Sequence, residues 1–412
     1  MVAPLLISCA SDPPAVRPSA TSDAPPISRQ QFEEVRALWV VRTSLDSPAA
    51  VRSLVERAAA SGFNTLFVQV RGRGDALYRS LLEPRPEFLS DRPGFDPLQL
   101  VIEEAHARGL AVHAWVNAYL VWSAADPPHD PSHLVNAHPE WLAVPRSLGR
   151  QLYDRDPRDP QYVQQLIDYG AAVDVVEGLY TSPSHPGVQE RLQRVWVDLA
   201  TGYELDGIHH DFIRFATSAF DYSRSTLEQF QAWVRPLVDA ERYQELAAAV
   251  RDDPYAMADA LPELWDRFRR DNVTDLVRRI YDEVKTRRPH LVVSAAVLPD
   301  WRSAASWQFQ DWSSWLADGI LDVAVPMAYT GDEEQFRGWI DAARATAGAP
   351  GRVWAGVGAY RNPVQRTVRQ IDLARAIGVG GIAVFAYHRA AATPPPEGTT
   401  QSLERIGDAA FR

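Results

Sequence analysis

The strongest constraint on the fold is a repeated alternation of short apolar segments with amphipathic ones. Between residues 36 and 390, eight apolar runs of strand length recur, separated by segments with helical spacing or by long connections. These runs are 37–41, 65–71, 111–117, 206–215, 291–297, 321–329, 353–358 and 381–387. Strands that alternate with helices form parallel sheets, and eight such units are typical of a (β/α)8 TIM barrel, an α/β fold.

A doubly wound open sheet is the main alternative architecture. It should show a glycine-rich phosphate-binding turn after its first strand. The segment at that place, Thr43-Ser44-Leu45-Asp46, contains no glycine. A helix is predicted at 48–61, and Gly62 ends it in the way a helix C-cap does. The sequence therefore favours the barrel.

Several segments depart from the regular alternation. Residues 120–187 form a long, proline-rich excursion with few periodic signals, and loops of that length are usually functional or act as lids. Residues 224–288 are predicted to be a helical insertion. We expect a partial signal segment with a lipobox over 1–9, a disordered Pro/Ser-rich tether over 10–32, and the barrel over 33–412.

Composition limits the classes of function. The chain has 412 residues, of which 46% are hydrophobic and 23% charged, as in globular proteins. Its net charge is −11 and its basic residues form no stripe, which argues against a nucleic acid partner. The single cysteine, Cys9, excludes an internal disulfide and a cysteine-rich metal site.

Cys9 also suggests a location. Leu6-Ile7-Ser8-Cys9 matches a bacterial lipobox, whose cysteine is cleaved and lipidated. The apolar run before it is short for a signal peptide and no basic residue leads it, so either the true start lies upstream or Cys9 is only an N-terminal cysteine. The tether that follows favours a lipoprotein. We expect an extracytoplasmic protein of the bacterial cell envelope, attached to the membrane by a lipid anchor only.

The fourth apolar run contains the most informative carboxylate. Side chains alternate along a strand, so His209 and Asp211 are expected on one face and His210 on the other. An ionised carboxylate in an apolar run is costly unless it is paired or used. A structural Asp bonded to a neighbouring Arg or His is the alternative to a functional one. By the same alternation Arg214 points away from Asp211, so a direct pair between them is not expected.

Polar and aromatic residues recur at the predicted C-terminal ends of the strands, where barrel active sites are built. Those ends contain Arg71, Asn117, Asp211, Tyr329, Tyr360 and Tyr387. This recurrence favours a functional Asp211. Aromatic faces stack on sugar rings, so an aromatic set predicts a carbohydrate cleft, although core packing is the alternative for each member. That set is Trp115, Trp354, Tyr329, Tyr360 and Tyr387.

A metal site is an alternative interpretation of the same positions. His113, His209 and Asp211 are ordinary ligand types. No strand contains a His-x-His pair, and no cysteine is nearby. We therefore predict neither a metal nor a cofactor, and assign His113 and His209 to substrate binding with the aromatic set.

Several motifs in register resemble those of the glycosyl hydrolase-like family ten proteins. They are Gln69-Val70-Arg71-Gly72-Arg73-Gly74-Asp75-Ala76-Leu77-Tyr78, His113-Ala114-Trp115-Val116-Asn117, Ser184-His185-Pro186, Asp206-Gly207-Ile208-His209 with Asp211, Gln310-Asp311-Trp312, Val325-Pro326-Met327-Ala328-Tyr329-Thr330, and Gly381-Ile382 with Phe385. The resemblance covers about 36–390. It implies a (β/α)8 barrel of bacterial envelope proteins and lipoproteins, thought to hydrolyse glycosidic bonds, with some members linked to peptidoglycan glycan strands. The sequence departs from the family at His210, where an aliphatic residue facing the helices is expected.

Glycoside hydrolysis usually needs two carboxyl groups. Asp211 is the first. Asp332 and Asp300 lie in loops after strands and are the candidates for the second, Asp332 by analogy with related barrels. Asp75 lies between Arg71 and Arg73, which should lower its pKa, so we assign it with Arg71 and Asn117 to substrate binding.

Two further acids are expected to be structural. Asp206 and Asp322 fall at the starts of their strands, hence at the bottom of the barrel. The sequence thus predicts a glycosidase acting on a bacterial envelope polysaccharide, such as peptidoglycan glycan strands. The alternatives are a barrel that binds the polymer without cleaving it and a metal-dependent deacetylase or amidase acting on the same polymer.

Overall fold

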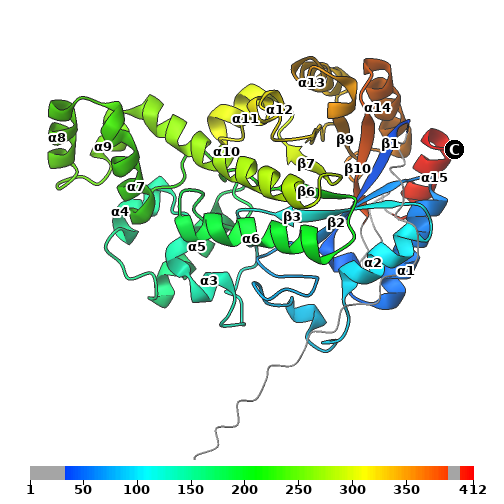
Figure 1. Cartoon of the computed structure of the whole chain (residues 1–412), viewed down its shortest axis with the longest axis horizontal. Helices are drawn as coiled ribbons and strands as arrows, with labels where there is room; N and C mark the ends of the chain where they lie inside the picture. Colours follow the sequence, from blue (N-terminus) through cyan, green and yellow to red (C-terminus); the bar gives the residue numbers. More distant parts are fainter. Residues whose placement is uncertain (1–32, 388–399) are drawn as a thin grey trace, which may run out of the picture. The chain divides into compact units, whose positions relative to one another are not determined.

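The computed structural model describes residues 33–387 and 400–412, which all belong to one unit of the chain, Phe32–Arg412 (Figure 1). The predicted lipobox, Cys9 and the predicted tether lie outside the described residues. Within the part described, no helix is both long enough and apolar enough to cross a lipid bilayer.

Eight parallel strands form the central sheet, in the order β8-β7-β6-β3-β2-β1-β10-β9. Their bounds are β1 Val35–Val40, β2 Thr65–Arg71, β3 Ala111–Asn117, β6 Gly207–Asp211, β7 Val292–Val297, β8 Val323–Pro326, β9 Trp354–Gly358 and β10 Gly381–Tyr387. The two edge strands, β8 and β9, meet through parallel bridges between Ala324 and Val353 and between Met327 and Gly356. The sheet is therefore a nearly closed (β/α)8 barrel, which confirms the predicted fold.

Helices cover the outside of this sheet and fill the long connections (Figure 1). They are α1 Pro48–Ala60, α2 Pro97–His106, α3 Leu134–Ala137, α4 Arg146–Leu152, α5 Pro160–Ala172, α6 Pro186–Gly202, α7 Arg224–Val234, α8 Ala240–Ala249, α9 Ala256–Ala260, α10 Pro262–Arg287, α11 Trp301–Trp307, α12 Trp312–Ala317, α13 Glu333–Thr346, α14 Val364–Ile377 and α15 Thr400–Ala410. Short 3-10 turns occupy Arg42–Ser44, Glu87–Leu89, Pro139–Trp141, Arg235–Leu237 and Pro350–Arg352.

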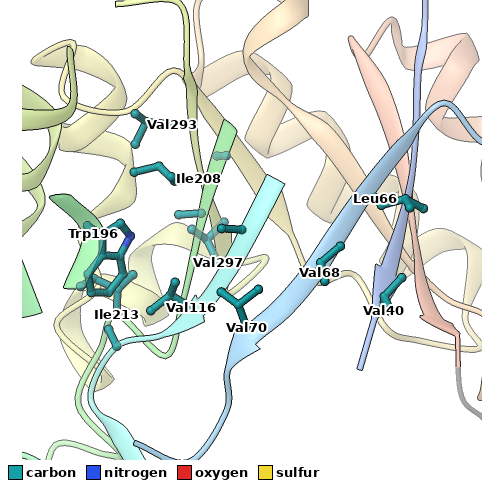
Figure 2. Packing of buried hydrophobic residues seen from close by; sticks show 14 of the residues in the cluster. Val40, Leu66, Val68, Val70, Val116, Trp196, Ile208, Ile213, Val293 and Val297 are labelled. Atoms are coloured by element: carbon teal, nitrogen blue, oxygen red, sulfur yellow. The ribbon is translucent and has the colours of Figure 1, made fainter. Parts of the chain in front are cut away.

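Strand alternation divides the buried residues into two cores. Outward side chains such as Val68, Val116 and Ile208 pack against the surrounding helices, and Trp196 of α6 is part of that cluster (Figure 2). Inward side chains, among them Trp39 and Trp115, fill the barrel. The inner core contains large aromatic rings, so the barrel interior is packed rather than open.

The excursion over 120–187 is more structured than the sequence indicated. Strands β4, Leu120–Trp122, and β5, Leu179–Tyr180, pair in an antiparallel way, and the excursion has an apolar cluster of its own. It also contains α5, a helix of 13 residues whose buried face includes Tyr162, Leu166 and Ile167, a helical pattern that the sequence analysis did not predict. Residues 224–288 form α7 to α10. Helices α7 to α9 share a separate cluster with the start of α10, whereas Val273 and Val284 further along α10 pack in the main core of the barrel.

Candidate active site

Asp211 is the last residue of β6, the fourth barrel strand, and pairs with Asn117 at the end of β3. It is 6% exposed. The next residue, Phe212, has a φ of +48°, which is strained for a bulky side chain. That bend brings the Phe212 N–H to 2.7 Å from Asp211 Oδ1. The strand thus ends in a turn that fixes the carboxyl group at the C-terminal rim.

Arg214 contacts the same carboxyl group. Its Nη1 donates to Asp211 Oδ1 over 3.3 Å, and its guanidinium lies 4.2 Å from the centre of the Phe212 ring. The prediction that Arg214 points away was wrong, because β6 ends at Asp211 and strand alternation stops there. The left-handed Phe212 redirects the chain and returns Arg214 to the side of Asp211.

Burial and hydrogen bonding act in opposite directions on Asp211. Burial raises the pKa of Asp211, while the Arg214 guanidinium, the Phe212 N–H and the Trp115 indole lower it, and the net shift is upward. The Trp115 Nε1 donates to Oδ2 over 3.1 Å. Burial and the nearby Asp211 also keep the pKa of Tyr329 well above its usual range. Asp211 and Tyr329 therefore share one electrostatic environment.

A second carboxyl group, which the sequence reading missed, contacts Arg214. Glu177 Oε1 lies 3.5 Å from Arg214 Nη2, and the Tyr180 hydroxyl donates to Glu177 Oε2 over 2.6 Å. The Glu177 side chain is 40% exposed. Glu177 lies in a stretch without strand or helix periodicity, so alternation could not place it. The signal that could have marked it is Gly178 beside it, at a sharp backbone turn.

Tyr329, whose pKa is affected by Asp211, belongs to a cluster of aromatic rings. Tyr329 lies 5.9 Å from Tyr360 and 5.5 Å from Phe385, measured between ring centres, and Trp39 lies 5.9 Å from Phe385. Tyr360 is 49% exposed, whereas Trp39 is buried. Trp115, Tyr329 and Tyr360 were predicted; Trp39 and Phe385 were missed because an inward strand aromatic resembles ordinary core.

The two inward histidines belong to the packed interior. His209 stacks on Phe67 with ring centres 4.1 Å apart, its Nε2 accepts from Trp39 Nε1 over 3.1 Å, and its Nδ1 is 2.9 Å from Ser294 Oγ. Burial holds the pKa of His209 well below its usual range and lowers that of His113 to about 4. Assigning these neutral, buried rings to substrate binding was wrong, because alternation gives the face of a residue but not its depth.

Two predicted aromatic residues lie elsewhere. Trp354 is the first residue of β9, at the opposite end from the rim, and packs in the inner core against Phe67. Tyr387 ends β10 but packs in the outer cluster, and its carbonyl accepts from Ser44 Oγ. Both predictions of a rim position facing the sugar were wrong.

The polar residues of the second and third strands support loops. Arg71 is fully buried and forms a two-point ion pair with Glu83, at 2.6 and 2.8 Å. Asp75 pairs with Arg42 over 2.8 Å. Asn117 Nδ2 donates to the Gly72 carbonyl over 3.0 Å. All three side chains are buried and have protein partners, so the structure gives them a role in holding these loops.

Asp332 and Asp300 are helix caps. Asp332 accepts from the backbone N–H groups of Glu334 and Gln335 at the start of α13, and Asp300 accepts from the Arg302 N–H at the start of α11. The structure thus gives both carboxylates a capping role, and none of the described contacts joins either of them to Asp211. Proximity in sequence to a strand end could not distinguish a cap from a catalytic acid.

The predictions for Asp206, Asp322 and His210 are confirmed. Asp206 bonds to His106 and to the Val112 N–H, and Asp322 bonds to Lys285, so both are structural. His210 points outward and lies 5.0 Å from Trp196 on α6. Across residues 33–387 and 400–412, no group of three or more His, Cys, Asp or Glu side chains is arranged to hold a metal ion.

Comparison with known proteins places this barrel among glycoside hydrolase-like proteins. The model of the family Glycosyl hydrolase-like 10 matches residues 34–350. Glycosyl hydrolase DigH of Escherichia coli K12 is 26% identical over 364 residues, covering 79% of this chain and 72% of DigH. Glycosyl hydrolase YngK of Bacillus subtilis is 24% identical over 336 residues, covering 73% of this chain and 55% of YngK.

A solved structure agrees on the fold. The glycoside hydrolase domain of PgaB (BpsB) from Bordetella bronchiseptica superposes with a TM-score of 0.61 and 16% identity, covering 92% of this chain and 99% of that one. At this identity the likeness establishes the barrel alone, and the chemistry has to be argued from the residues.

Proposed function

Because the chain belongs to the glycosyl hydrolase-like 10 family, we propose that it hydrolyses glycosidic bonds in a bacterial envelope polysaccharide, such as peptidoglycan glycan strands. The proposal rests above all on Asp211, a buried carboxyl group at the C-terminal rim of the fourth barrel strand. Barrel active sites are built at that rim. Asp211 is the principal catalytic group.

The surroundings of Asp211 suit a proton donor. Burial raises its pKa, which favours the protonated form that glycosidic oxygen needs in order to leave. The Phe212 N–H and the Arg214 guanidinium both contact Oδ1, whereas Trp115 contacts Oδ2. A protonated Oδ2 can keep its bond from Trp115 and still direct its proton towards a bound sugar.

The half-exposed ring of Tyr360 supports a carbohydrate ligand. Its edge-to-face contacts with Tyr329 and Phe385 hold the ring upright beside the site. A fixed aromatic ring with an accessible surface offers apolar contact to the C–H face of a sugar at little entropic cost. Tyr360 is the proposed stacking platform, with Tyr329 and Trp115 as the inner wall of the subsite.

The function is tested by incubating the full chain with a panel of polysaccharides that includes denuded peptidoglycan glycan strands. New reducing ends should appear with wild type and be absent with Asp211→Asn. The variant should still bind the same strands and melt cooperatively, which would show that it is folded. Asp322→Asn is the matched control, since Asp322 is a structural acid at the other end of the barrel.

Two outcomes would point to the alternatives. Strand binding by wild type with no reducing ends from any polymer would favour a binding barrel over a hydrolase. Release of acetate that a chelator stops, without chain cleavage, would favour a metal-dependent deacetylase. Either result would refute the proposed glycosidase.

We also propose that Cys9 is lipidated and anchors the protein in the cell envelope. The support is the Leu6-Ile7-Ser8-Cys9 lipobox and the tether composition after it. Mass spectrometry of the N-terminus from membranes should find a diacylglyceryl group on Cys9. Release of the protein into the soluble fraction by Cys9→Ser is the second expected result, and an unmodified Cys9 in wild type would refute the anchor.

A further inference from the structure

We infer that Glu177 is the second catalytic carboxylate, which acts with Asp211 on a sugar unit bound between them. The inference rests on the proposed hydrolase function and adds a residue to it. Both groups contact one buried guanidinium, that of Arg214, whose side chain is 5% exposed. Glu177 is thereby connected to Asp211, a connection that neither Asp332 nor Asp300 makes in the described contacts.

The two carboxyl groups contact different nitrogens of the Arg214 guanidinium. Asp211 Oδ1 lies 3.3 Å from Nη1, and Glu177 Oε1 lies 3.5 Å from Nη2, so each contacts a different terminal nitrogen. Two carboxyl groups that contact the two terminal nitrogens of one guanidinium are separated from each other rather than in contact. Inverting enzymes need about 6.5–9.5 Å between their carboxyl groups to admit a water, against about 5–5.5 Å in retaining ones. A Glu177 that acts as a base on water requires the wider separation, and inversion is the outcome that this role predicts.

Glu177 is held in place by the local fold. Tyr180 is a buried residue of β5, and its hydroxyl donates to Glu177 Oε2 over 2.6 Å. Gly178 has a φ of +150°, and a Cβ there would overlap the Trp122 carbonyl oxygen on the neighbouring β4. Only glycine fits this close approach, and the turn it allows directs the Glu177 side chain towards Arg214.

The two acids have different surroundings, which separates their roles. Asp211 is buried and accepts a hydrogen bond from the Trp115 indole, whereas the Glu177 side chain is 40% exposed and is therefore accessible to water. A buried acid is suited to give a proton, and an exposed carboxylate is suited to accept one from water. Glu177 is therefore the base of the pair.

The reaction then balances without another reactant. Asp211 gives its proton to the glycosidic oxygen while the bond from that oxygen to the anomeric carbon breaks. A water oxygen bonds to the anomeric carbon, and the proton it loses passes to Glu177. After the two shorter glycans leave, solvent returns the proton from Glu177 to Asp211. The water approaches from the side opposite the leaving oxygen, so the anomeric configuration inverts.

The test compares Glu177→Gln with wild type on the polymer that wild type cleaves. Loss of the base should lower kcat by about a hundred-fold or more while KM changes little, since general base catalysis contributes about 10²–10⁴-fold. Asp174→Asn is the matched control, because Asp174 is an exposed acid of the same loop. Its rate should stay at the wild-type value.

Two further readouts separate catalysis from a structural role. Sodium azide should restore turnover of Glu177→Ala and yield a glycosyl azide of inverted configuration, because azide needs no base to attack the anomeric carbon. Proton NMR of the first product of wild type should show the inverted anomer. Glu177→Asp, which keeps the charge, should retain more activity than Glu177→Gln. It replaces Glu177→Gln in the comparison with wild type if that variant does not fold.

The outcomes distinguish this inference from the proposed function. If wild type cleaves the polymer and Glu177→Gln keeps its kcat, or azide restores nothing, Glu177 is not the base although the hydrolase stands. A retained anomer in the first wild-type product would also overturn the inference. If wild type cleaves no polysaccharide, the proposed function fails and the inference fails with it.

Discussion

The indole Nε1 of Trp115 in β3 donates a hydrogen bond over 3.1 Å to Oδ2 of Asp211 at the end of the neighbouring strand β6. The bond lies between an inner-core aromatic residue and the proposed proton donor. It orients the carboxyl group and, as a bond to the charged form, opposes the upward shift that burial gives its pKa.

Trp115→Phe should therefore slow cleavage and change its pH dependence. Without the indole donor the pKa of Asp211 rises further, so the alkaline limb of kcat/KM should move to higher pH. Loss of one preorganised donor should lower kcat by about ten- to a hundred-fold. Trp196→Phe is the control, since Trp196 is also fully buried and its Nε1 has no hydrogen-bond partner among the described residues. An unshifted alkaline limb in Trp115→Phe would argue against Asp211 as the proton donor.

Asp211→Asn should raise thermal stability at neutral pH while abolishing activity. The pKa of Asp211 is raised on folding, so its contribution to stability is full below the unfolded value of 3.8 and is lost as pH rises through the folded value. Asparagine resembles the neutral acid, so the variant keeps this contribution to stability as the pH rises. Melting curves should show a higher Tm for the variant at pH 7, with the gap narrowing as the pH falls towards 4. A lower Tm at pH 7 would mean that the bond to Arg214 outweighs the burial.

The barrel could be predicted from the sequence because each of its strands shows a local hydrophobic pattern. Runs such as 65–71, 111–117 and 381–387 coincide with β2, β3 and β10, since parallel barrel strands are apolar on both sides and stand out from their neighbours. Asp211 was found for the same reason: a carboxylate is conspicuous in such a run.

The rest of the site depends on contacts that no local pattern records. Glu177 approaches Arg214 through the β4–β5 pairing, and Arg214 approaches Asp211 through the left-handed Phe212. Neither the depth of His209 nor the end of the barrel at which Trp354 lies follows from alternation, because alternation assigns a face and not a layer. Most of the wrong predictions therefore concern positions that depend on contacts between residues far apart in the sequence.

Arg71 and Glu83 should prove essential for stability rather than for substrate binding. Their ion pair is almost completely buried, with side chains 0% and 1% exposed. Glu83→Gln leaves a buried guanidinium without its counter-charge, which costs about 3–5 kcal/mol in the free energy of unfolding. Denaturant titration measures the loss. Glu283→Gln is the control, because its pair with Arg287 is half-exposed, and a surface pair contributes about 0–1 kcal/mol. Equal losses in the two variants would contradict this assignment.

Asp332 should contribute as a cap. Replacing it by alanine leaves the N–H groups of Glu334 and Gln335 without their side-chain acceptor, which costs about 0.5–2 kcal/mol. Asparagine caps helices about as well as aspartate, so Asp332→Asn should unfold close to wild type. Thermal melts of the two variants test this. If both melt below wild type by the same amount, the carboxylate acts through its charge and not through capping, and if both melt like wild type, Asp332 contributes nothing to stability.

Tyr360 should determine how tightly the polymer binds rather than how fast it reacts. Its exposed ring stands against Tyr329 and Phe385, and an aromatic contact of this kind contributes about 0.5–1.5 kcal/mol beyond the area buried. Tyr360→Ala should therefore raise KM by about ten-fold while kcat falls little, and Tyr360→Phe, which keeps the ring, should bind like wild type. Tyr243→Ala is the control, because Tyr243 is a partly exposed tyrosine on α8 of the helical insertion. If Tyr360→Ala and Tyr243→Ala give the same KM as wild type, the sugar does not stack on this ring, and the subsite has to be sought on the Glu177 side of Arg214.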